Sequence, residues 1–240
     1  MKSDKIVKYS QRIDLLIVHH ILAWLCRLIF RVYGRWRVVG LENVPQSGST
    51  VFAANHASYL DPILGWAAIY GTRRMWGVAR SELWNSKVLA YLLEAIRVFP
   101  VHRNTADRAM LRKALAVLQR GDTIGIFPEG TRTYDGLLNP GQPGIALMVQ
   151  KSSSPVVPVA LIGTFEMLPR KQKRLKRVPL LVAFGKPIYF GEKASREEIT
   201  TRVMAEIAAL LTENGRPMEP PSAERAALLL ANEDQLVDSD

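Results

Sequence analysis

The chain has 240 residues, of which 48% are hydrophobic and 22% are charged, and its formal net charge is +10. This length and composition are typical of one globular domain with short appendages, and they argue against a disordered chain. The single cysteine, Cys26, excludes an internal disulfide and a cysteine-based metal site, and the four histidines show no zinc-site spacing. An intracellular location is therefore the default expectation.

The positive charge favours an anionic partner, which could be a nucleic acid, an acidic lipid or a phosphorylated substrate. The charge is unevenly distributed, because the segment from Met218 to the C-terminus has six acidic residues and one basic residue, Arg225. That segment has a balance of −5, so the +10 of the whole chain leaves +15 for the remainder. Charge alone does not choose among the three kinds of partner.

The first long apolar run covers residues 13–33 and follows four basic residues: Lys2, Lys5, Lys8 and Arg12. Charged or ionisable side chains interrupt it: Asp14, His19, His20, Arg27 and Arg31. A transmembrane helix needs roughly 18 or more apolar residues with few charges, and no small-residue cleavage site of a secretory signal follows. We therefore expect residues 1–34 to form an amphipathic helix at the membrane interface, on the cytoplasmic face. A single span and a buried core helix are the alternatives.

Beyond this helix, short β-rich runs alternate with helical stretches. Strands are expected at 35–41, 49–54, 75–79, 98–101, 122–127, 155–162 and 178–184, and helices at 60–70, 86–95, 105–120, 144–151 and 195–211. The alternation predicts an α/β domain over residues 35–213, in which a mixed, largely parallel central sheet is flanked by helices. Residues 214–240, with three prolines followed by acidic sequence, are expected to form a mobile tail that can hold a short helix.

His56 and Asp61 form the most informative pair of side chains, and they are five residues apart. On a helix, five residues rotate the chain about 140° beyond a full turn, so the two side chains would point apart. On a strand, an odd separation places them on opposite faces. Only a turn from a strand into a helix lets them meet, and this segment lies between a predicted strand and a predicted helix.

The same residues also suit an ordinary helix start. Asp61 followed by Pro62 resembles an N-cap with proline at the first helical position, and Ser58 with Asp61 resembles a capping box. Taken alone, the pattern leaves both interpretations open. They are compatible, since one carboxylate can accept a backbone N–H and an imidazole N–H.

Three further stretches come at the ends of predicted strands: residues 97–103, residues 127–132, which read Phe-Pro-Glu-Gly-Thr-Arg, and residues 155–159. Strand ends at one edge of an α/β sheet are where ligands bind. Arg103 and Arg132 suit a phosphate, because guanidinium forms paired N–H bonds to its oxygens. Gly130 allows the backbone to approach an anion closely.

In these stretches the sequence resembles the glycerolipid acyltransferases, the family typified by 1-acyl-sn-glycerol-3-phosphate acyltransferase. Four ordered blocks of that family are present: Asn55-His56 with Asp61, the segment ending at Arg103, Phe127 to Arg132, and Val157-Pro158-Val159. The resemblance covers roughly residues 35–211, and its first and third blocks are highly specific. The chain departs from the family pattern at Arg97, where many members have glycine. This difference could alter the pocket for the acceptor, so it affects the choice of acceptor more than the class of reaction.

The resemblance implies transfer of a fatty acyl group from acyl-CoA or acyl carrier protein to the free hydroxyl of a lysophospholipid, with no bound cofactor or metal. His56 is then the general base. Asp61 holds the imidazole tautomer, and the substrate supplies the nucleophile. Arg103 and Arg132, with the Glu129-Gly130-Thr131 turn, would bind the acceptor phosphate, and Glu129 would pair with an arginine or contact the glycerol.

The implied reaction acylates the sn-2 hydroxyl of 1-acyl-sn-glycerol-3-phosphate to give phosphatidic acid, with another lysophospholipid or a lyso-aminolipid as the alternative acceptor. An anionic membrane surface is the expected partner, and nucleic acid is not. Six basic residues within positions 170–177 would contact lipid headgroups, the phosphates of the donor or an acidic carrier protein, unless they form an ordinary solvated loop.

Two other classes of function compete with this interpretation. A hydrolase would use Ser58 as a nucleophile activated by His56, but the sequence has no Gly-x-Ser-x-Gly elbow. A non-catalytic basic protein that binds membranes or nucleic acid would explain the charge. It would not explain the His56 and Asp61 pair together with the Glu-Gly-Thr-Arg block.

Overall fold

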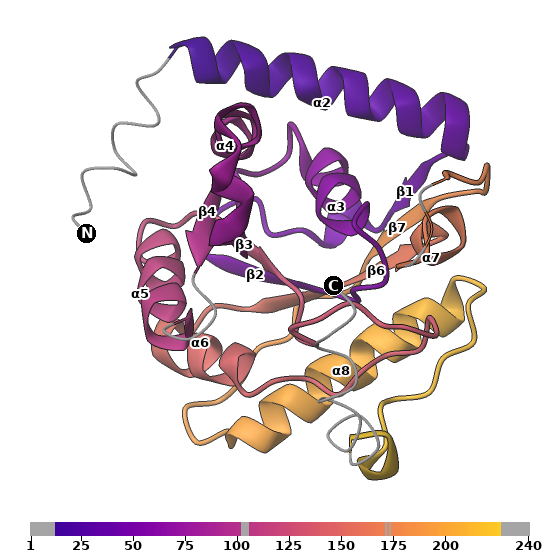
Figure 1. The fold of residues 1–240 in the computed structure, drawn as a ribbon. Helices are drawn as coiled ribbons and strands as arrows, with labels where there is room; N and C mark the ends of the chain where they lie inside the picture. The colour runs from indigo at the N-terminus through magenta and orange to yellow at the C-terminus, as the bar shows by residue number, and fades with distance from the viewer. Residues whose placement is uncertain (1–12, 102–105, 171, 173, 227–240) are drawn as a thin grey trace.

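The fold is an α/β sandwich, seen in a computed structural model that describes residues 13–101, 106–170, 172 and 174–226 (Figure 1). The strands are β1 (Arg37–Val39), β2 (Thr50–Ala54), β3 (Met75–Arg80), β4 (Val98–Val101), β5 (Thr123–Ile126), β6 (Val156–Ile162) and β7 (Leu181–Phe184). The helices are α2 (Ile13–Gly34), α3 (Asp61–Ile69), α4 (Lys87–Ala95), α5 (Ala106–Leu118), α6 (Gly144–Ser152), α7 (Thr164–Met167) and α8 (Arg196–Glu213), with short 3-10 turns η1 (Leu41–Asn43) and η2 (Ser81–Asn85).

The seven strands form one sheet in the order β1-β7-β6-β2-β5-β3-β4. All neighbouring pairs are parallel except β6 and β7, which are antiparallel. The predicted mixed, largely parallel sheet is thereby confirmed. β2 lies between β5 and β6, with Val51 opposite Ile124 on one side and Val156 on the other. Four of its five residues are apolar, in keeping with helices that cover both faces of the sheet.

Two apolar cores lie on the two faces of the sheet. On one face α5, α6 and α8 pack against the strands, with Val117, Met148 and Ile207 fully buried. On the other face α3 and α2 pack against them, with Leu64 of α3 and Ala23 of α2 fully buried. Figure 1 shows α2 lying across α3 and α4 at the top, and α8 below the sheet.

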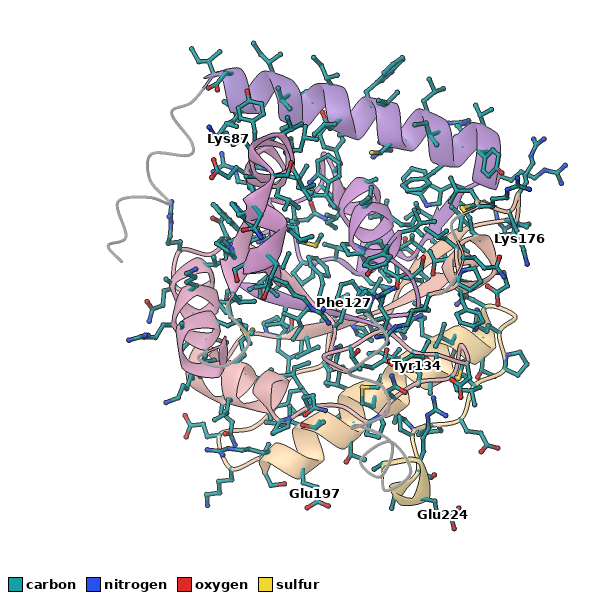
Figure 2. The ribbon with its side chains drawn as sticks, in the orientation of Figure 1. Lys87, Phe127, Tyr134, Lys176, Glu197 and Glu224 are labelled. Atoms are coloured by element: carbon teal, nitrogen blue, oxygen red, sulfur yellow. The ribbon has the colours of Figure 1, made fainter. Side chains whose placement is uncertain are left out.

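Helix α2 buries only one side against the domain. Its opposite side exposes a stripe of large apolar side chains at helical spacing: Ile13, Ile17, Ile21, Trp24, Leu28 and Val32. Figure 2 shows the side chains on the outer side of α2 projecting away from the rest of the molecule. Within the described part of the chain, α2 is also the one helix long and apolar enough to cross a membrane. The helix predicted within residues 1–34 is therefore present, and its outer face is suited to lipid.

Arg97 adopts a φ of 61°, in the left-handed region that favours glycine. This conformation gives a physical reason for glycine at the corresponding position in many family members. In this chain the Arg97 side chain lies beside α2, with Nη1 at 3.3 Å from Nε2 of the buried His19. His19 in turn bonds the Ala95 carbonyl through Nδ1, at 2.8 Å. Arg97 therefore connects α2 to the start of β4.

The C-terminal segment after α8 makes specific contacts over residues 214–226. Arg216 donates to the Glu166 carboxylate at 2.8 Å and to the Gly136 carbonyl at 3.0 Å. Arg225 follows Ser222, whose hydroxyl accepts the Arg225 N–H at 3.1 Å. A mobile tail was expected here, and these contacts were not part of that expectation. They arise from arginine donors that meet carbonyl groups of a distant loop, which local sequence does not reveal.

Candidate active site

His56 and Asp61 meet at the turn between β2 and α3. The imidazole Nδ1 lies 2.9 Å from Asp61 Oδ2. The side chain of Asp61 is fully buried, and that of His56 is 17% exposed. The strand ends at Ala54 and the helix begins at Asp61, so the chain reverses between them and brings together two residues that neither regular element could pair. The pairing required by the proposed general base is therefore present.

The turn itself is held by the same carboxylate. Asp61 Oδ2 also accepts the backbone N–H groups of Ala57, at 2.5 Å, and Ser58, at 2.6 Å. The bond to Ser58 is one half of the predicted capping box. The other half is absent, because the Asp61 N–H donates to the Ser58 carbonyl at 3.3 Å. The Ser58 hydroxyl instead accepts the Leu60 N–H at 3.2 Å and donates to the Leu168 carbonyl at 2.9 Å. Asp61 thus caps the turn and binds the imidazole at once, and the buried Ser58 hydroxyl is engaged away from His56.

The backbone and ring of His56 are fixed from several sides. Phe127 stacks on the imidazole, with ring centroids 3.9 Å apart and planes inclined by 14°. The His56 carbonyl accepts the Thr133 N–H at 2.9 Å. One residue earlier, the Asn55 side chain bonds both the N–H and the carbonyl of Leu161, at 2.7 and 3.0 Å, which ties the end of β2 to β6. The first and third sequence blocks therefore form one compact site.

Glu129 is buried against the backbone of His56. It is 2% exposed, and Oε1 accepts the His56 N–H at 2.6 Å while Oε2 accepts the Asn139 N–H at 2.8 Å. Burial raises the pKa of Glu129 to about 8; the backbone hydrogen bonds oppose this rise and the nearby Asp61 charge adds to it. Pairing with an arginine or contact with glycerol was predicted for this residue. Both oxygens instead bond backbone amides, which indicates a supporting role.

The other residues of the third block flank this centre. Gly130 has a φ of 70°, where a side chain would be strained, and both Gly130 and Thr131 are exposed. Arg132 is mostly buried, and its guanidinium lies 3.5 Å from the centroid of the Tyr59 ring. Because Tyr59 belongs to the turn between His56 and Asp61, this stacking places Arg132 at the same turn. Arg103, the other predicted phosphate ligand, lies outside the described residues.

The predicted basic run connects the site with α2. Arg170 stacks on Tyr134 and donates to the Arg132 carbonyl at 3.3 Å. Farther along the run, Arg177 donates to the Val32 carbonyl near the end of α2, at 3.3 Å. In Figure 2, Lys176 of the same run lies near that end of α2, and Tyr134 lies lower in the view. The described part of the run therefore extends from the site to the outer helix.

A histidine held by a buried aspartate at the end of a parallel strand, with arginine beside it, is an arrangement suited to general-base chemistry on an anionic substrate. The Acyltransferase family model matches residues 35–162, which include His56, Asp61 and the block that ends at Arg132. The chain belongs to this acyltransferase family.

Two relatives of this chain are named for one reaction. A chloroplastic 1-acyl-sn-glycerol-3-phosphate acyltransferase of Brassica napus is 30% identical over 73% of this chain and 52% of its own length. The 1-acyl-sn-glycerol-3-phosphate acyltransferase of Bacillus subtilis is 27% identical over 75% of this chain and 88% of its own length. The match thus spans about half of the plant relative and most of the bacterial one.

A solved structure has the same fold. The crystal structure of the 1-acyl-sn-glycerophosphate acyltransferase PlsC from Thermotoga maritima aligns with a TM-score of 0.70, over 84% of this chain and 81% of that one. Its sequence identity is 24%, so the likeness concerns the fold.

Proposed function

We propose that the protein transfers a fatty acyl group from acyl-CoA or acyl carrier protein to the sn-2 hydroxyl of 1-acyl-sn-glycerol-3-phosphate, giving phosphatidic acid. The observation that carries this proposal is the bond between His56 Nδ1 and the buried Asp61, next to Arg132. A carboxylate can only accept a hydrogen bond here, so Nδ1 carries the proton and the imidazole lone pair is on Nε2. A base in this tautomer can accept a hydroxyl proton.

In the proposed reaction, His56 Nε2 takes the proton of the acceptor hydroxyl as its oxygen attacks the thioester carbonyl. The tetrahedral intermediate then collapses, the carbon–sulfur bond breaks, and the protonated imidazole returns the proton to the leaving thiolate. Asp61 stabilises the transient positive charge on the ring and holds its orientation. The protein contributes no nucleophile, in keeping with the Ser58 hydroxyl donating to Leu168.

The acceptor phosphate is proposed to lie on Arg132, together with Arg103 and the exposed backbone of Gly130 and Thr131. Guanidinium binds phosphate oxygens in pairs, and the left-handed Gly130 leaves that backbone open to an anion. Glu129 is proposed to act from behind, by fixing the His56 amide, rather than as a ligand of the acceptor.

The lipid substrate is proposed to reach the site from an anionic membrane surface. The apolar outer face of α2 supports insertion into the interface, and the basic residues near its C-terminal end support contact with headgroup phosphates. An orientation with α2 parallel to the bilayer accounts for its one buried and one exposed side.

The acceptor is tested by offering lysophosphatidate, lysophosphatidylethanolamine, lysophosphatidylcholine and a lyso-aminolipid to the purified protein in mixed micelles. Each is combined with acyl-CoA or acyl carrier protein, and products are measured by mass spectrometry. We expect phosphatidate to form at least about tenfold faster than any other product, a difference of about 1.4 kcal/mol in the barrier. If another lysolipid reacts faster, that lysolipid becomes the proposed acceptor, and the proposed mechanism is unchanged. No acylated product at all would favour a purely binding role.

A further inference from the structure

Arg225, in the C-terminal segment, makes five hydrogen bonds to one loop. Its Nη1 and Nη2 atoms bond the two carboxylate oxygens of Asp135, at 3.0 and 2.9 Å. Its Nε donates to the Leu138 carbonyl at 2.7 Å, and Nη2 also donates to the Leu137 carbonyl at 3.4 Å and to Asn139 Oδ1 at 3.0 Å. Nε, Nη1 and Nη2 all donate, and because the guanidinium is a rigid planar fork, the loop atoms that accept these bonds are held in one arrangement around it.

Two chains of hydrogen bonds lead from that loop to the backbone of His56. In the first, the Asn139 N–H donates to Glu129 at 2.8 Å, and Glu129 accepts the His56 N–H at 2.6 Å. In the second, the Thr133 hydroxyl donates to Asp135 at 2.8 Å, and the Thr133 N–H donates to the His56 carbonyl at 2.9 Å. Both backbone groups of the proposed base are therefore bonded through residues of one loop.

The loop has no regular structure of its own. Residues 127–143, between β5 and α6, contain neither helix nor strand. A connection of this length keeps one conformation only when other parts of the molecule hold it. Hydrogen bonds from Arg225, the Leu137 N–H and Thr133 outweigh burial and lower the pKa of Asp135 to about 2, so this carboxylate stays charged toward Arg225 at neutral pH. Arg225 lies well beyond the region matched by the family model, which ends at residue 162.

We propose that Arg225 is a positioning residue of the active site: it fixes the loop of residues 133–139, and through Glu129 and Thr133 it fixes the backbone of His56. The proposal rests on the role proposed above for His56. The C-terminal segment then completes the active site through Arg225, which acts on His56 by way of the loop rather than by touching the substrate.

A simpler view treats Arg225 and Asp135 as an ordinary surface ion pair, since their side chains are 21% and 51% exposed. Such pairs add little to stability, typically about 0–1 kcal/mol. The two views differ in what substitution changes. Substitution in a surface pair leaves kcat and the hydrogen exchange of the His56 amide unchanged. Substitution of a positioning residue changes both.

The kinetic test compares Arg225→Ala and Arg225→Lys with Arg202→Ala, a control arginine on α8 that stacks on Phe190. Displacement of a catalytic group by about 1 Å can lower a rate roughly 100-fold. We expect Arg225→Ala to lower kcat by about 10- to 100-fold with KM for donor and acceptor within about threefold. Arg225→Lys should recover part of the loss, added guanidinium ion should restore much of the Arg225→Ala rate, and Arg202→Ala should match the wild type.

A second measurement does not depend on the substrate. In Arg225→Ala, hydrogen exchange of the His56 amide should become about tenfold faster or more, which is a loss of about 1.4 kcal/mol of local protection. Exchange of the Val157 amide in β6 should stay unchanged. If no lysolipid is acylated, the proposed reaction fails, and this exchange still decides the role of Arg225. Unchanged His56 exchange, or a kcat within twofold of wild type in an enzyme active on lysolipids, would overturn the proposal.

Discussion

At the scale of single residues, the Oδ2 atom of Asp61 accepts three hydrogen bonds, from the His56 imidazole and from the N–H groups of Ala57 and Ser58. These donors offset the cost of burying a charged group, because a fully buried carboxylate needs partners. They also align the oxygen with the imidazole. One carboxylate oxygen thus holds the turn before α3 and binds the imidazole. The N-cap predicted at Asp61 was wrong by one position, because α3 begins at Asp61 and its N-cap residue is Leu60.

Glu129 leads to a prediction on stability. Its pKa is raised to about 8 from an ordinary value of 4.5, so between these pH values the folded state binds more protons than the unfolded state. The contribution of this group to stability is therefore fully present below about pH 4.5 and is lost as pH rises through about 8. Urea unfolding at several pH values from 4.5 to 8.5 should show this decline.

Glu129→Gln is the matched variant, because it keeps the size of the side chain and removes the titrating group. We expect it to be less stable at acidic pH, since its amide NH2 would face a backbone N–H donor. The difference between variant and wild type should shrink as pH rises. Parallel stability curves over the whole range would contradict the raised pKa.

At the scale of elements, the predicted strand, turn and helix around His56 agree with β2 and α3, because apolar runs and the five-residue spacing act locally. The supports of the site were not predicted. Glu129 bonds an amide 73 positions away in the chain, and Arg225 bonds Asp135 across 90 positions. Backbone amides are present at every residue, so nothing in the sequence marks those that a distant carboxylate will reach.

An interfacial helix was predicted from a largely apolar run that charged and ionisable side chains interrupt, and the structure adds which residues form the outer face of α2. Ile17 and Trp24 are 54% and 65% exposed. Burial of one such side chain in lipid contributes about 1.5–3 kcal/mol. Ile17→Glu combined with Trp24→Glu should therefore reduce binding to anionic vesicles by at least roughly 100-fold. Vesicle sedimentation measures this loss.

Tyr189→Glu is the control for this experiment, because Tyr189 is 70% exposed and lies outside α2. It should sediment with vesicles as the wild type does. If the double variant also sediments unchanged, α2 is not the membrane-binding element.

At the scale of the whole molecule, the family region of residues 35–162 is completed by segments on either side. Before it, α2 presents an apolar face. After it, the basic run contacts both α2, through Arg177, and Arg132, through Arg170. The C-terminal segment supports the loop behind the proposed base. The charge is divided in the same way, with +15 on residues 1–217 and −5 on the segment from Met218 onward, where Arg225 is the single basic residue.

The central claim is that His56 acts as a base on a hydroxyl supplied by the lipid, and the rates of His56→Ala and Ser58→Ala test it most directly. Acyl transfer to lysophosphatidate should fall by about 10²- to 10⁴-fold in His56→Ala. Ser58→Ala should keep most of the activity, since it loses only the bonds of the hydroxyl to the Leu168 carbonyl and the Leu60 N–H. Wild-type activity in His56→Ala, or loss of activity in Ser58→Ala together with an acylated serine in the wild type, would contradict the account.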